Sequence, residues 1–186
     1  MIGRFQFLIV IILSSFLVNM AIATNNNYIV GIRRSENDKT FDDESITVQQ
    51  AIIELVNERM NDIYNIIIEN QSTYVLENGA IDKKLNELNS TLPLSENTKF
   101  QFINVNRPNA TFNPSPDSPI EYIPLKSNLV SYVSPVLNYY TIKAYLSDEI
   151  VEKVEQLPNV ISCKKSAKLG RPERPVIRPS TGKKNN

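Results

Sequence analysis

The sequence predicts an α+β domain whose elements follow the order strand, helix, strand, strand, helix, strand. Residues 139–146 alternate between apolar and polar side chains, which is the pattern of a half-buried strand. A short stretch of helical periodicity and a second extended apolar run, at 160–163, come directly after it. Nearer the N-terminus, residues 48–67 carry apolar side chains at helical spacing. These observations favour a four-stranded antiparallel sheet packed against two helices.

Residues 1–23 have the pattern of a secretory signal peptide. Arg4 supplies a positive charge, residues 5–18 form an apolar core, and Ala21-Ile22-Ala23 is a small-x-small cleavage site. The apolar core is too short for a typical membrane span, and three asparagines follow it closely. We therefore expect cleavage after Ala23 and a secreted, extracellular protein, with an uncleaved anchor as the alternative.

Residues 28–33 predict the first strand, and residues 48–67 carry the spacing of the first helix. Tyr28-Ile29-Val30-Gly31-Ile32-Arg33 is rich in β-forming residues. The acidic and hydroxyl side chains at 42–45 can satisfy the free amides at the start of a helix. The apolar stripe of this helix is interpreted as core rather than as a ligand site, and it comprises Val48, Ile52, Val56, Met60, Ile63 and Ile67, widened by Leu55 and Ile66.

The middle of the chain is predicted to be a polar insertion. The helix ends at 70–73, and residues 80–88 are compatible with a shorter helix. Residues 90–124 are rich in Asn, Ser, Thr and Pro, and the prolines disfavour regular structure across most of this stretch, so we expect a loop there. Asn70, Asn89 and Asn109 each begin an N-glycosylation sequon, as fits a secreted and exposed segment.

The remaining elements follow after the insertion. Residues 128–136 predict a strand in which Pro135 suits an edge or a strand end, and Leu137-Asn138 predicts a turn into the strand at 139–146. In that strand the side chains predicted to point inward are Ile142, Ala144 and Leu146. Ser147 is predicted to cap a helix that carries Ile150, Val151, Val154 and Leu157 on one face and stops at Pro158-Asn159.

Composition restricts the chemistry that this chain can perform. It contains no histidine, which excludes Ser-His-Asp and Cys-His catalysis within the chain and removes the commonest transition-metal ligand. Its single cysteine, Cys163, cannot form an intramolecular disulfide, so it is expected to pack as a small hydrophobe, although pairing with another chain stays open. We expect no enzymatic activity and no cofactor.

Charge is distributed unevenly although 20 basic and 20 acidic residues balance formally. Acidic residues gather in the first half and basic residues near the end. Residues 170–186, which are rich in Pro, Lys and Arg, are predicted to be a disordered tail. A basic tail can bind nucleic acid or an anionic surface, but without interleaved aromatic residues a solvated linker or processing segment is the favoured interpretation.

The C-terminal half resembles the propeptides of secreted subtilisin-like serine proteases, of the fungal type. The resemblance lies in Ile142-Lys143-Ala144-Tyr145-Leu146-Ser147, in the helix that follows, and in Pro158-Asn159-Val160-Ile161-Ser162-Cys163. Tyr28-Ile29-Val30 resembles the opening strand of the same family. The resemblance implies a ferredoxin-like β-α-β-β-α-β fold over residues 24–169, and a binding activity without catalysis. The insertion has no counterpart in the family pattern.

Family propeptides set the outer face of their sheet against the protease and feed the following segment into its active-site cleft. The resemblance therefore implies that the protease-binding residues here are Thr141, Lys143 and Tyr145 on the sheet, Lys164 and Lys165 after it, and Ser166, Ala167, Lys168, Leu169 and Gly170 in the cleft. Lys164-Lys165 stands where the family often has acidic residues, so a different partner surface is plausible. The pair is also compatible with a dibasic cleavage site, although a solvated strand end is favoured.

The resemblance implies inhibition, and assistance in folding, of a subtilisin-like serine protease. The chain ends soon after the last predicted strand, which leaves three interpretations open. It is a separate inhibitor, a truncated prodomain of a larger protease, or a secreted binding module that reuses the fold without inhibiting. The expected partner is the protease, with no nucleic acid and no membrane after signal cleavage.

Overall fold

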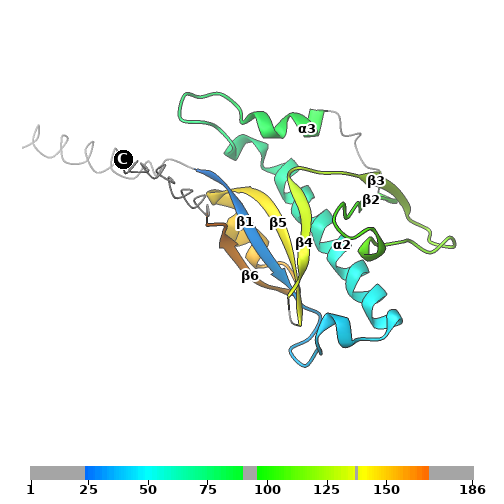
Figure 1. Ribbon diagram of the computed structural model, residues 1–186. Helices are drawn as coiled ribbons and strands as arrows, with labels where there is room; N and C mark the ends of the chain where they lie inside the picture. The colour runs from blue at the N-terminus through cyan, green and yellow to red at the C-terminus, as the bar shows by residue number, and fades with distance from the viewer. Residues whose placement is uncertain (1–23, 90–95, 137, 168–186) are drawn as a thin grey trace, which may run out of the picture.

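Figure 1 presents the computed structural model of the protein, which describes residues 24–89, 96–136 and 138–167. The predicted signal peptide and the predicted tail at 170–186 lie outside the described residues. The described part is an α+β fold built on a four-stranded antiparallel sheet, as the sequence predicts.

The sheet has the strand order β4-β5-β1-β6. Its strands are β1 (Asn25–Ile32), β4 (Val130–Val136), β5 (Tyr139–Ser147) and β6 (Val160–Lys165), and each adjacent pair is antiparallel. In the centre of the sheet Val30 lies between Ile142 of β5 and Cys163 of β6. All four strands lie where the sequence predicts them, with ends that differ by at most three residues.

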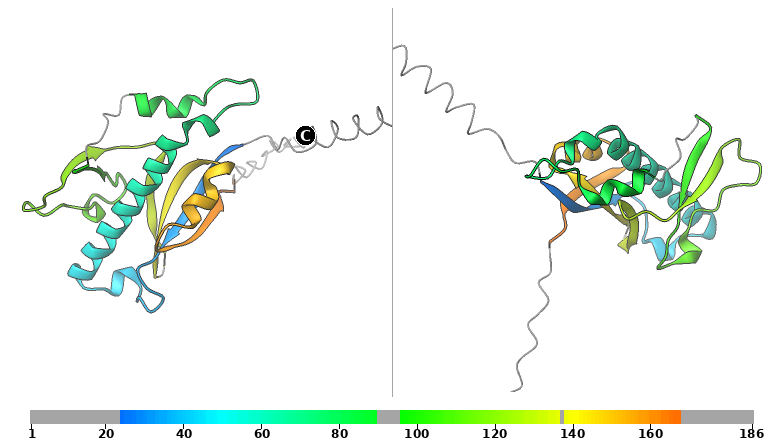
Figure 2. Two further views of the ribbon diagram at one scale, coloured as in Figure 1. Left: turned by 180° about the vertical axis from the view of Figure 1, so that it is seen from behind. Right: turned by 90° about the horizontal axis from the view of Figure 1, so that it is seen from above.

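Both longer helical segments lie on one face of this sheet (Figure 2, left). They are α2 (Ile46–Glu69), and α4 (Val151–Glu155) preceded by the 3-10 turn η5 (Asp148–Ile150). Ile142, Ala144 and Leu146 point from β5 into the core between sheet and helices and are fully buried, so the predicted phase of this strand is confirmed. The other side of the sheet is called the open face below.

The α2 helix begins as predicted, because the Ser45 hydroxyl accepts a hydrogen bond from the Val48 amide at 3.3 Å. Val56, Met60, Ile63 and Ile67 of the predicted stripe are fully buried. The helix also has a second buried face that the sequence analysis missed, made of Ile53, Asn57, Asn61 and Tyr64.

That second face packs against a pair of short parallel strands, β2 (Thr98–Phe102) and β3 (Glu121–Leu125). Figures 1 and 2 show α2 between this pair and the main sheet. The expectation of a loop across 90–124 is therefore corrected. The prolines between 108 and 119 do fall outside the strands, and Pro124 is accommodated within β3.

Two buried asparagines of α2 hold β2 in place. The Asn61 amide group donates to the Phe100 carbonyl at 2.8 Å and accepts from the Phe100 amide at 2.8 Å. Asn57 donates to the same carbonyl and accepts from the Phe102 amide, both at 2.9 Å. The two side chains thus supply the hydrogen bonds that a neighbouring strand would otherwise make.

Residues 70–89 return over the end of the open face. They contain the 3-10 turns η2 (Gln71–Thr73) and η3 (Lys83–Leu85) and the single-turn helix α3 (Asn86–Asn89), rather than one helix over 80–88. Tyr74 is fully buried and its hydroxyl donates to the Tyr145 carbonyl at 2.9 Å. The Ser147 hydroxyl lies 2.6 Å from that of Thr73 and does not cap the following helix, which corrects its predicted role.

Candidate functional site

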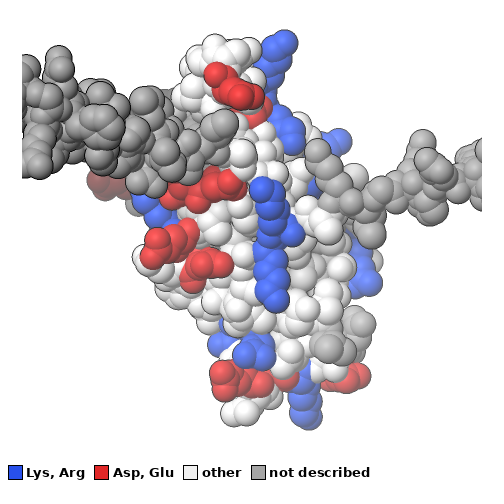
Figure 3. All heavy atoms as spheres, turned by 90° about the vertical axis from the view of Figure 1, so that its left-hand side faces the viewer, with Lys and Arg blue, Asp and Glu red and all other residues white. Residues whose placement is uncertain are grey.

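The open face presents one lysine from each of two strands that flank β1. Lys143 of β5 and Lys164 of β6 both stand opposite Ile29 of β1, so the three side chains form a row across the sheet. Both lysines are exposed and Ile29 is half-buried. Figure 3, seen from the side that carries β6, shows basic side chains down the middle of the molecule with acidic side chains to their left.

Of the three β5 residues that are expected to contact a partner, only Lys143 is exposed. Thr141 is 7% exposed, and its hydroxyl donates to the Ser134 carbonyl at 2.6 Å. Tyr145 is also 7% exposed, so the expectation that its side chain is available to a partner is corrected. The cause is the segment at 74–84, which lies over this end of the open face.

Tyr145 is held by three residues of the covering segment. Its hydroxyl donates to the Asp82 carboxylate, and its ring lies 5.9 Å from that of Tyr74. The Lys84 ammonium stands 3.8 Å from the centre of the Tyr145 ring, within cation–π range. None of these partners has a local sequence signal that points to Tyr145, since they lie more than sixty residues away along the chain.

The hydrogen bonds of Asp82 determine its protonation. Burial acts to raise the pKa of this carboxyl, but hydrogen bonds from Tyr145, from the Lys84 amide and from the Asn25 side chain outweigh it and lower the pKa below its usual value. Burial and the Asp82 bond raise the pKa of Tyr145 far above its usual value. Asp82 is therefore an ionised acceptor that ties β1, β5 and the covering segment together.

The C-terminal exit of the fold lies beside β1. The Ser166 amide donates to the Asn27 carbonyl at 2.8 Å, which continues the pairing of β6 with β1 for one residue beyond Lys165. Lys164, Lys165 and Ala167 are exposed and Ser166 is half-buried. The expected cleft-binding residues Lys168, Leu169 and Gly170 lie outside the described residues.

Two hollows adjoin each other at this end of the open face, with volumes of about 580 and 790 Å³. They share Asn27 and Lys84, and we call them together the basic groove. The first also contacts Tyr145, Lys165 and the exit at Ser166 and Ala167. The basic groove is lined in all by five lysines, namely Lys83, Lys84, Lys126, Lys143 and Lys165.

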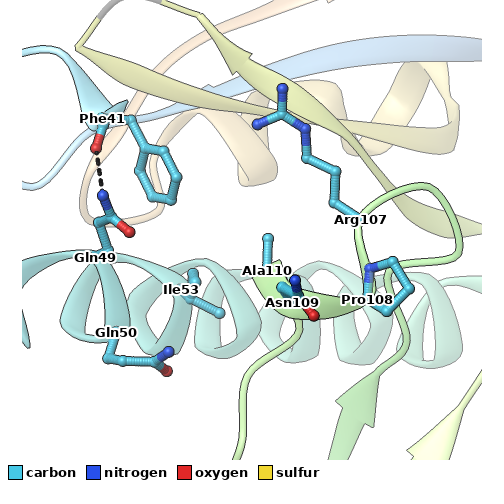
Figure 4. Close-up of a pocket in the computed structure, with 8 residues that line it drawn as sticks. All are labelled: Phe41, Gln49, Gln50, Ile53, Arg107, Pro108, Asn109 and Ala110. Atoms are coloured by element: carbon cyan, nitrogen blue, oxygen red, sulfur yellow. Dashed lines mark hydrogen bonds between the residues drawn. The ribbon is translucent and has the colours of Figure 1, made fainter. Parts of the chain in front are cut away.

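A separate pocket of about 310 Å³ lies between the start of α2 and the turn at Pro108–Ala110. Figure 4 shows Phe41 and Arg107 on opposite sides of it, above Ile53 of α2. The Gln49 side chain closes one end by donating to the Phe41 carbonyl at 3.2 Å. The pocket shares no residue with the basic groove.

The three predicted sequons differ in exposure. The Asn70 side chain is half-buried, donates to the Ile66 carbonyl at 2.7 Å and accepts from the Lys153 ammonium at 2.7 Å. Asn89 and Asn109 are exposed. A glycan at Asn70 would be attached to the amide nitrogen that donates to Ile66, so the exposed Asn89 and Asn109 are the better candidates.

Cys163 is buried, as predicted, and burial raises the pKa of its thiol to about 12. It therefore stays protonated within the core. Within residues 24–89, 96–136 and 138–167, no group of three or more His, Cys, Asp or Glu side chains is placed to hold a metal ion. In the same ranges, no helix combines the length and the apolar character needed to cross a membrane.

Comparison of the chain with models of protein families, with characterised proteins and with solved structures gives no match to any of them.

Proposed function

We propose that this protein binds and inhibits a subtilisin-like serine protease through the open face and the segment that follows β6. The proposal includes a ferredoxin-like topology, which is supported by the order β4-β5-β1-β6 and by the placement of α2 and α4 on one face. It also includes the secreted location that residues 1–23 predict.

The observation that carries the proposal is the position of the C-terminal exit. The pairing of Ser166 with Asn27 directs the chain out of the sheet at the end of β6, beside the open face. A protein docked on that face would lie next to the exit at Ser166 and Ala167. An extended segment in a protease cleft gains affinity from main-chain hydrogen bonds and selectivity from alternate side chains.

Inhibition of this kind requires no catalytic group on the inhibitor. The open face supplies the docking surface, with Lys143 and Lys164 as its exposed charges, and the following segment occupies the cleft as a product does. An inhibitor that binds the folded protease, but not the unfolded chain, stabilises the folded form by mass action. This is the physical basis of assisted folding.

Inhibition kinetics against a panel of secreted subtilisin-like proteases test the proposal. We expect at least one protease to be inhibited, and the Lys143→Glu variant to inhibit it more weakly because the exposed charge at the interface is reversed. Lys39→Glu is the matched control, since Lys39 is exposed in the loop between β1 and α2. A panel without any inhibited member, or equal weakening by both variants, would contradict the proposal.

A second candidate is a secreted binding module that inhibits no protease. The covering segment favours it, because burial of Thr141 and Tyr145 leaves less of the open face available than the resemblance implies. Binding of a protein to the open face without loss of any protease activity would favour this candidate. A protease domain encoded directly downstream would instead favour a truncated prodomain.

A further inference from the structure

We propose that the basic groove is a docking site for an acidic segment of the partner protein. This inference rests on the proposed function only for the identity of the partner. The groove itself is argued from its lining, its charge and its place beside the C-terminal exit.

The groove carries a large excess of positive charge. Five of its lining residues are lysines, and its only carboxylate is that of Glu87. Glu87 is committed within the fold, because one oxygen accepts from the Asn128 amide at 2.7 Å and the other accepts from the Ser127 hydroxyl. Among the described residues, none of the five lysines lies within salt-bridge distance of a carboxylate. Lys84 and Lys165 are nevertheless near enough to Asp82 and Asp148 to help lower the pKa of those carboxyls, so Lys83, Lys126 and Lys143 carry the uncompensated charge.

Four of the five lysines that line the groove come from three separate parts of the chain. Lys83 and Lys84 belong to η3, Lys126 follows β3, and Lys143 belongs to β5. Like charges repel when they are gathered on one surface, so a partner that neutralises them gains electrostatic free energy on binding. A fold without such a partner has no evident reason to concentrate them here.

Acidic side chains gather beside the basic groove, and one of them, Asp148, accepts a hydrogen bond from the Asn26 side chain at the edge of the groove. Asp148, Glu149, Glu152 and Glu155, in and just before α4, are all exposed. Figure 3 shows acidic side chains gathered on one side of the basic run. This separation of charge would orient an acidic partner toward the basic groove during its approach.

The chemistry of the lining favours carboxylates over phosphates and over nucleic acid. The groove contains no arginine, the side chain whose planar fork is best suited to phosphate. Its aromatic residue, Tyr145, is buried and already covered by Lys84, so it offers no platform for a stacked base. Three asparagine side chains between the lysines can pair with a peptide backbone, namely Asn27, Asn86 and Asn128.

Charge also argues against the protein's own tail as the occupant. Residues 168–186 carry lysines and arginines together with a single acidic residue, Glu173. The basic groove would repel such a segment. The occupant we propose is therefore an acidic segment of a separate protein, of extended form and docked beside the exit at Ser166.

Binding of a fluorescent poly-glutamate peptide to the full-length protein tests the site, with poly-glutamine as the uncharged comparison. We expect poly-glutamate to bind and poly-glutamine not to bind. The binding of poly-glutamate should weaken as salt is added. The Lys83→Glu, Lys126→Glu double variant should bind it about tenfold or more weakly, because two of the lining charges are reversed. The Lys183→Glu, Lys184→Glu double variant changes the net charge equally and should bind nearly as the unchanged protein does.

Equal weakening by the two double variants would overturn the proposal, since it would show a general attraction between charges. Tighter binding of heparin than of poly-glutamate would overturn it in favour of a sulfated polymer. The same variants assayed against an inhibited protease test the link to the proposed function. If a variant loses peptide binding but inhibits the protease as before, the groove serves another acidic partner. If no protease is inhibited, the peptide-binding result still tests the groove by itself.

Discussion

Tyr145 connects the open face of the sheet to the segment that covers it. The alternation of residues 139–146 predicts the side of the sheet to which its ring points, because successive side chains of a strand point in opposite directions. The alternation contains no information on what lies above that side. Burial of the ring depends on Tyr74, Asp82 and Lys84, which reach it only through the fold.

Removal of the Tyr145 ring should destabilise the protein. Tyr145→Ala deletes a buried ring and leaves the Asp82 carboxylate without its hydroxyl donor, so we expect a loss of roughly 3 kcal/mol in the free energy of unfolding. Chemical unfolding followed by circular dichroism measures this loss. Lys143→Ala, two residues earlier and exposed, is the matched control and should change stability little. Equal stability of both variants would show that the covering segment does not pack on Tyr145.

Stability should fall in acid, in part through Asp82. Its pKa is lowered in the folded state, so the hydrogen bonds to its carboxylate contribute stability above its unfolded pKa of about 4, and this contribution is lost as the pH falls through the lower folded value. Asp82→Asn should therefore flatten the dependence of the free energy of unfolding on pH below about 4. The exposed Asp117→Asn is the control. A dependence unchanged by Asp82→Asn would contradict the assignment.

At the scale of elements, the sequence predicts the core residues of those strands and helices whose apolar side chains repeat at a regular spacing. The strand at β5 and the stripe of α2 have strong periodicity, and their core residues are the predicted ones. The second buried face of α2 was missed because two of its members are asparagines, which ordinarily indicate a solvated face. Their burial depends on β2, whose own pattern is hidden within a segment rich in prolines.

Leu146 anchors β5 in the core. Leu146→Ala should cost about 2 to 5 kcal/mol, because this side chain is fully buried between sheet and helices. Leu157 was expected to be equally buried, but it is only partly so, and Leu157→Ala should cost less. Thermal unfolding of the two variants side by side measures the difference. A midpoint for Leu146→Ala equal to that of the unchanged protein would rule out this packing.

The hydrogen bonds from Asn61 should stabilise the packing of β2 on α2. Asn61→Leu leaves the Phe100 amide without its side-chain acceptor in a buried place, so we expect a loss of about 1 to 3 kcal/mol. Hydrogen exchange at the Phe100 amide should accelerate in this variant. Asn65→Leu, one turn later and exposed, is the matched control. Protection of the Phe100 amide that is equal in both variants would contradict the role of Asn61.

For the whole molecule, the sequence predicted the sheet and its two helices but not how the middle of the chain surrounds them. The parallel β2–β3 pair joins segments separated by nearly twenty residues, and no turn signal specifies such a pairing. The basic groove was missed for the same reason, since Lys83, Lys126 and Lys143 have no shared pattern in sequence. Of the predicted binding residues, Lys143, Lys164 and Lys165 are exposed as that role requires.

The most direct measurement of the central claim compares the inhibition constants of the full-length protein and of a chain ending at Ser166. The shorter chain keeps β6 and the bond from the Ser166 amide to Asn27, so circular dichroism should show an intact fold. We expect its inhibition of a susceptible subtilisin-like protease to weaken by orders of magnitude, because residues 167–170 are proposed to fill the active-site cleft. Equal inhibition by the two chains would show that this segment does not occupy the cleft and would contradict the account.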